Sequence, residues 1–95
     1  MTEEERFARL VRSFHSLLPS PFKDVNDLRL LDAWAFNKDP DGSDGVKAAA
    51  AFVLNCWSTY TEWKCGYFDM FHALRVWDDS QRRAFQSWVE NPWRP

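Results

Sequence analysis

One segment of the chain restricts the possible folds more than any other. Between Gly45 and Lys64 the apolar side chains follow a helical period and cover more than half of the helix circumference. A helix that is apolar over so much of its surface packs against neighbours on several sides. We therefore predict a central helix over residues 45–64, with Gly66 as its C-terminal cap.

Shorter amphipathic segments lie on both sides of this helix. Thr2 and Glu5 form a T-x-x-E capping box before an apolar stripe that extends to Leu18. Further helices are predicted from Asp24 or Asn26 to Phe36, over residues 68–76, and from an N-cap at Asp78, and no segment shows strand alternation. The predicted fold is all-α: a compact single-domain bundle of four to five short helices with an apolar third helix at its centre. Residues 92–95 are predicted to form a short Pro/Trp tail.

Size and charge exclude several classes of protein. A chain of 95 residues has room for one core. The net charge is −2, with nine acids and seven bases in residues 1–47 and five of each in residues 48–95. This balance lacks the basic excess of a phosphate-backbone binder, so nucleic acid is disfavoured as a partner. We find no secretory signal and no membrane-spanning stretch. Two cysteines are most simply interpreted as reduced thiols in a cytoplasmic protein.

Two patterns resemble metal sites in part. The loop from Asn37 to Gly45 matches the first, third, fifth and sixth positions of a calcium-binding EF-hand loop. Its twelfth position is Ala48, where a bidentate Glu is needed, so we interpret the loop as a solvated turn. Two Cys and two His are present without zinc-ligand spacing. We expect no metal and no cofactor.

Support for catalysis is equally thin. Asp69 and His72 have the spacing at which a carboxylate can orient an imidazole, and Cys65 is a nearby nucleophile. The three residues match no catalytic motif, and no glycine-rich phosphate loop is present. The sequence therefore predicts a protein that is not an enzyme, with a structural role for His72.

Five of the six tryptophans lie between positions 57 and 93. Helical spacing assigns Trp57, Trp77 and Trp88 to the core. Trp63 lies at the edge of the apolar face, and Trp93 is on the tail beside Arg94. Because Trp and Arg are enriched in interface hot spots, we hypothesise that these three residues border a surface for another protein or a second copy.

Two basic residues of the last helix complete the predicted binding set. Arg82 and Arg83 are expected on its solvent face, paired with Asp78 and Asp79. The predicted function is a small non-enzymatic interaction module, for example an inhibitor or immunity-type protein of bacterial or phage origin. Its expected partner is a protein or a homo-oligomer. The alternative is a nucleic-acid-binding regulator that uses the Arg and Trp residues of the last two helices.

Overall fold

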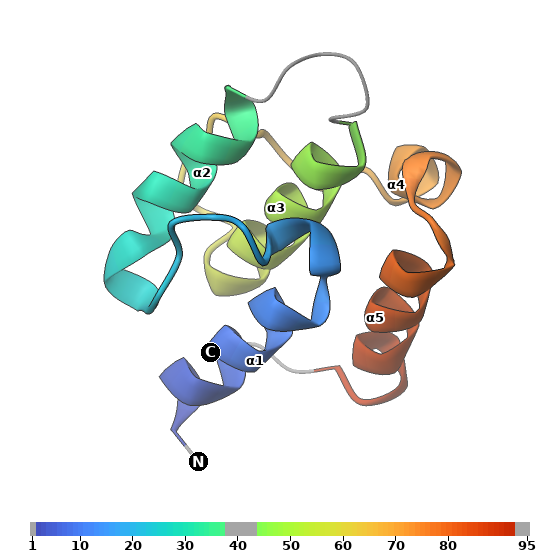
Figure 1. Cartoon of the computed structure of the whole chain (residues 1–95), viewed down its shortest axis with the longest axis horizontal. Coiled ribbons are helices and arrows are strands. Elements are labelled where there is room, and N and C mark those ends of the chain that lie inside the picture. The colour runs from blue at the N-terminus through green and yellow to red at the C-terminus, as the bar shows by residue number, and fades with distance from the viewer. Residues whose placement is uncertain (1, 38–43, 93–95) are drawn as a thin grey trace.

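The computed structural model describes residues 2–37 and 44–92, and it is a compact all-α bundle. Within these ranges the chain forms helices and loops and contains no strand, which confirms the predicted fold class (Figure 1). The helices are α1 (Glu3–Ser13), α2 (Leu28–Phe36), α3 (Asp44–Trp57), α4 (Met70–Val76) and α5 (Asp79–Glu90), with short 3₁₀ turns at His15–Leu17 and Val25–Asp27.

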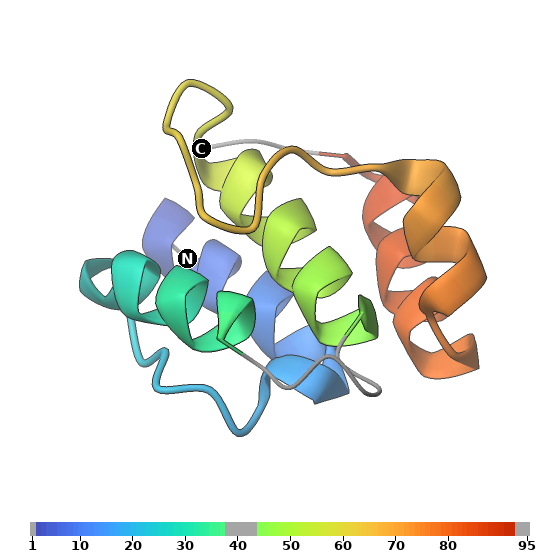
Figure 2. The same cartoon turned by 90° about the horizontal axis from the view of Figure 1, so that it is seen from above.

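Helix α3 is the centre of the bundle, as its apolar circumference predicts. Its residues from Ala48 to Cys56 are all buried. Helices α1, α2 and α4 all contact it, and the two views together place α3 between α2 on one side and α4 and α5 on the other (Figures 1 and 2). The small side chains of residues 48–51 allow these neighbours to approach closely.

Aromatic rings join α5 to the rest of the core. Phe52 on α3 packs edge-on against Phe85 and Trp88 of α5, with ring centroids 5.1 Å apart in both pairs. It also contacts Phe14, Phe68 and Trp77, so residues from four parts of the chain meet at one ring. We call these six residues the Phe52 cluster. Of the three predicted core tryptophans, Trp77 is buried, and Trp57 and Trp88 are partly buried against the core.

The predicted C-terminal end of the central helix is wrong by seven residues. Helix α3 stops at Trp57, and residues 58–69 form a loop. The run Ser58-Thr-Tyr-Thr61 disfavours a helix, because hydroxyl side chains compete for backbone hydrogen bonds. The indole Nε1 of Trp63 donates to the carbonyl of Ser58 at 2.9 Å, so the chain doubles back. Tyr60, which a helix continued to Lys64 would place on the apolar face, is therefore almost fully exposed.

The end of α1 also differs from the prediction. The helix ends at Ser13, whose hydroxyl donates to the carbonyl of Leu10 at 2.6 Å, and Phe14 is extended. The change in backbone direction turns Leu17 into the core and leaves Leu18 60% exposed. The predicted apolar stripe is correct only as far as Leu17.

Two predicted helix starts are confirmed. The hydroxyl of Thr2 accepts a hydrogen bond from the backbone N–H of Glu5 at 3.1 Å. The carboxylate of Asp78 accepts one from the backbone N–H of Gln81 at 2.9 Å. Asp78 does not pair with an arginine as expected. Its other oxygen lies 2.8 Å from Nε2 of His15, which connects the start of α5 to the 3₁₀ turn after α1.

Candidate functional site

Four large apolar side chains on and beside α4 are exposed within a span of eight residues. The exposed fractions are 78% for Tyr67, 43% for Met70, 77% for Phe71 and 36% for Leu74. We call these four residues the α4 surface. Met70, Phe71 and Leu74 share one side of the helix, because Leu74 lies four positions after Met70 and three after Phe71. Both views place α4 at the edge of the molecule (Figures 1 and 2).

Tyr67 precedes the helix but lies next to its first turn. Together with Asp69 and His72 it lines a cleft of about 150 Å³. The carboxylate of Asp69 accepts a hydrogen bond from the backbone N–H of His72 at 3.1 Å and so caps α4. The predicted contact between Asp69 and His72 exists, but it joins the carboxylate to the backbone rather than to the imidazole.

The opposite side of α4 rests on the aromatic core. Ala73 is fully buried, and the ring of Trp77, directly after the helix, stacks on Phe68 at 5.7 Å and 25°. The indole N–H of Trp77 donates to the carbonyl of Gly45 at 3.1 Å. A seven-residue helix is marginal by itself, so these contacts are what hold the α4 surface in place.

Arginines border the C-terminal end of this surface. Arg75 is exposed one helical turn after Phe71. Nε and Nη2 of Arg82 donate to the carbonyl of Leu74 at 3.1 and 2.6 Å, which satisfies a backbone group at the end of α4. Arg82 therefore caps the end of α4 and does not pair with Asp78 or Asp79, as the sequence suggested it would. Arg83 is exposed on α5.

The loop before α4 is tied to the core by two polar residues that sequence reasoning missed. Both oxygens of Asp32, which is buried on α2, accept from the backbone N–H groups of Lys64 and Cys65 at 2.8 and 3.0 Å. The amide of Asn55 on α3 donates to the carbonyl of Gly66 at 2.9 Å. Their signal in the sequence is a polar residue on an otherwise apolar helix face.

Gly66 allows this loop to turn. Its φ is +78°, a conformation that side chains other than hydrogen disfavour. Positive φ was expected here, but for a helix cap rather than for a turn inside a loop.

The structure describes one of the two tryptophans that the sequence assigned to a surface, and that ring is not exposed. Trp63 is buried, and its indole nitrogen is bonded to Ser58, so the fold alone accounts for this ring. Trp93 and Arg94 lie outside the described residues, as does most of the loop from Asn37 to Gly45. Among the described residues of the C-terminal half, the large apolar side chains that are exposed are those of the α4 surface, Tyr60 and Val89.

The cysteine beside α4 has a thiol of low reactivity. Cys65 lines the same cleft as Asp69 and His72. Its burial, and then its contact with Asp32, raise the pKa of its thiol to about 12. Because the thiolate is the nucleophile, almost none of the reactive form is present at neutral pH. The arrangement gives the nucleophile hypothesis no support.

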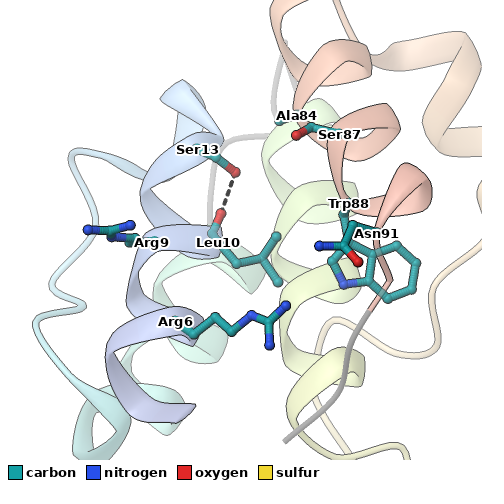
Figure 3. A pocket seen from close by; sticks show the side chains of 8 residues that line it. All are labelled: Arg6, Arg9, Leu10, Ser13, Ala84, Ser87, Trp88 and Asn91. Atoms are coloured by element: carbon teal, nitrogen blue, oxygen red, sulfur yellow. Dashed lines mark hydrogen bonds between the residues drawn. The ribbon is translucent and has the colours of Figure 1, made fainter. Parts of the chain in front are cut away.

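A second hollow lies between α1 and α5 (Figure 3). It has a volume of about 310 Å³, and polar groups from both helices line it together with Leu10, Ala84 and Trp88. The guanidinium of Arg6 extends toward α5, whereas that of Arg9 points away from the hollow. The hydroxyl proton of Ser13 is used by Leu10. The two arginines do not converge on one point, as an oxyanion site would require.

The described residues form neither a metal-binding cluster nor a helix that could span a membrane. They contain no group of three or more His, Cys, Asp or Glu side chains placed to hold a metal ion. None of their helices combines the length and the apolar character needed to cross a membrane.

Comparison with known proteins provides no match, whether with protein-family models, with curated proteins or with solved structures. A function for this chain therefore has to be argued from its own surface and chemistry.

Proposed function

We propose that this protein is a non-enzymatic interaction module that binds another protein through the α4 surface. The observation that carries the proposal is the exposure of four large apolar side chains within residues 67–74. Single exposed apolar residues are normal on a protein surface, but a group of them rimmed by polar residues marks an interaction site. Tyr, Phe, Met and Arg are also the residue types enriched at interfaces.

The charges around the surface define the partner further. Arg75 is exposed at its C-terminal end, and a basic group there favours a carboxylate on the partner. We infer that the partner presents an apolar segment with an acidic residue at one end. The surface is held by the aromatic core beneath it, so binding needs little ordering of the chain, which favours affinity.

The proposal includes a cytoplasmic location and an inhibitory mode of action. Both cysteines are free thiols, which suits a reducing compartment. A small module that covers an apolar site on its partner would block that site, as inhibitors and immunity-type proteins do.

The test is site-specific cross-linking in the cells that contain the protein. A photo-reactive phenylalanine analogue replaces Phe71, and in a matched control it replaces Leu30, which is 55% exposed on α2. We expect an adduct with a second protein from position 71 and not from position 30. The cross-linked protein is identified, purified and titrated against the unlabelled chain.

The titration decides the outcome. Phe71→Asp should weaken binding at least tenfold, because it places a charge in the buried part of the interface. Leu30→Asp should leave the affinity unchanged. Equal affinities for wild type and Phe71→Asp, or no adduct specific to position 71, would overturn the proposal.

Nucleic-acid binding is the alternative, through Arg82, Arg83 and the tryptophans of the last two helices. Arg82 already donates to Leu74, which leaves it less free to contact a phosphate. A gel-shift titration separates the alternatives, since phosphate contacts produce binding that weakens steeply with salt. The interaction module is expected to show no shift at low salt.

A further inference from the structure

We propose that a cleft between α3, α5 and the loop after α3 binds a small neutral aromatic molecule that carries an N–H or O–H donor. The cleft has a volume of about 310 Å³. Its described lining comes from residues 52–56 of α3, from residues 59–68 of the loop and from Trp88 of α5. Of the α4 surface only Tyr67 lines it, so this site is independent of the proposed function.

Aromatic rings of the Phe52 cluster form the apolar part of the cleft. Phe68 and Trp88 are both partly buried, and the centroid of each ring lies 5.1 Å from that of Phe52. The parts of these rings that the core leaves uncovered favour contact with the rings of an apolar ligand. No Asp, Glu, Lys, Arg or His is among the described lining residues, so a charged ligand would lose its hydration without gaining a counter-charge. The expected ligand is therefore neutral.

One polar atom in the cleft determines what else the ligand must carry. The side chain of Asn55 lines the cleft and is 9% exposed. Its amide nitrogen donates to the carbonyl oxygens of Ala51 at 2.7 Å and Gly66 at 2.9 Å, and two acceptors on this side fix the orientation of the amide. Both amide protons are therefore used, while Oδ1 accepts no hydrogen bond from the described part of the chain.

A buried oxygen without a donor is costly, and a ligand can supply the donor. An N–H or O–H group on the ligand would pair with Oδ1 of Asn55, while its rings cover Phe68 and Trp88. Ligand sites commonly combine apolar walls with a few placed polar groups in this way. A cavity of about 150 Å³ holds benzene, so a cleft of about 310 Å³ has room for two fused rings. Indole has this size and chemistry.

The experiment is a titration of the isotope-labelled chain with indole, followed by nuclear magnetic resonance. We expect saturable binding with a Kd on the order of 0.1–1 mM, because a ligand this small buries little area. The backbone amides of residues 52–59 and 66–68 and the indole N–H of Trp88 should shift, and the amides of α2 should not. The absence of saturable shifts at tenfold higher concentration, or shifts confined to other residues, would overturn the proposal.

Benzofuran tests the hydrogen bond to Asn55, since it has the shape of indole and lacks the N–H. It should bind about three- to tenfold more weakly, because Oδ1 is then covered without a donor. Equal affinities for the two compounds would contradict the proposed ligand class.

A matched pair of substitutions tests the location. Thr59→Phe places a ring in the cleft and should weaken indole binding at least tenfold by steric exclusion. Thr61→Phe makes the same change in the same loop, at a residue that does not line this cleft, and should leave the affinity unchanged. Circular dichroism confirms that both variants keep the fold. Equal binding by the two variants would place the ligand elsewhere and overturn the proposal.

The chain carries an indole of its own at Trp93, which lies outside the described residues. Trp93→Ala decides between this ring and a free ligand as the occupant. Equal affinity of indole for wild type and Trp93→Ala supports a free ligand. Indole that binds only to Trp93→Ala would overturn the proposal in favour of Trp93.

Discussion

The Phe52 cluster and the α4 surface use the same kinds of residue but place them in opposite environments. In the Phe52 cluster Trp77 is buried and Phe68 is partly buried, whereas Tyr67 and Phe71 lie within a few residues of them and are nearly four-fifths exposed. The buried rings are explained by packing, since aromatic side chains supply much apolar area to a small core. The exposed rings add nothing to that core. Aromatic content by itself therefore does not indicate function in this chain, because residues of the same types occur in the core and on the surface.

The largest expected effect on stability comes from a substitution in the Phe52 cluster. Phe52→Ala should lower the free energy of unfolding by about 3–5 kcal/mol, because it removes the ring that five other aromatic residues contact. Urea denaturation followed by circular dichroism measures the change. A loss below about 1 kcal/mol would contradict the view that these rings form one packing unit.

The loop between the two regions should show an intermediate effect. Asp32→Ala leaves the backbone N–H groups of Lys64 and Cys65 without their acceptor, which should cost about 1–3 kcal/mol. Hydrogen exchange should become faster at these two amides, while amides in α1 keep their protection. The matched control is Glu62→Ala, which removes an exposed acid from the same loop. Equal exchange in the two variants would show that Asp32 does not hold the loop.

A smaller effect is expected at the polar edge of the cluster, where Asp78 meets His15. Hydrogen bonds from Gln81 and then from His15 lower the pKa of Asp78. A lowered pKa stabilises the fold above the unfolded value of about 3.9, and this contribution is lost as the pH falls through the folded pKa. The carboxylate is more than half exposed, so solvent screening keeps the effect small.

The pH dependence can be measured with Asp78→Asn, which keeps the helix cap and removes the charge. Its Tm should lie slightly below that of the wild type at pH 7, and the difference should shrink as the pH falls below the unfolded value of about 3.9. A difference that stays constant from pH 7 to pH 2 would exclude the charge as its origin.

The smallest effect on stability is expected on the exposed side. Phe71→Ala should change the free energy of unfolding by less than about 0.5 kcal/mol, because its ring is mainly in solvent. The same variant should weaken the binding of a partner to the α4 surface. Phe52→Ala is not a test of that binding, because it lowers the stability of the whole chain. A loss of several kcal/mol on Phe71→Ala would place this ring in the core and end the distinction between the two regions.

Local signals predicted much of the fold. The caps at Thr2 and Asp78, the buried circumference of α3 and the core position of Trp77 follow from short-range patterns and are all confirmed. The predicted end of α3 was wrong, because the apolar periodicity continues to Trp63 although the chain turns at Ser58. That turn depends on a hydrogen bond from the Trp63 indole, which periodicity does not report.

The candidate site was harder to predict than the fold. Sequence reasoning placed the exposed rings at Trp63 and Trp93 and assigned residues 68–76 to a helix without separating its faces. The side of α4 that faces the core is set by Ala73 and by the stack of Phe68 on Trp77. In a seven-residue helix, several apolar residues compete for the buried side, and only long-range packing selects among them.

The sequence by itself determined that this chain is a helical bundle built around one apolar helix, because helical periodicity and capping depend on neighbours a few residues apart. Only the tertiary structure decided which aromatic residues are buried and which face solvent. That choice depends on contacts between distant residues, such as Asp32 with the backbone of Lys64 and Phe52 with Trp88. The α4 surface is the result of those contacts, since they hold the loop and leave Tyr67 and Phe71 outside.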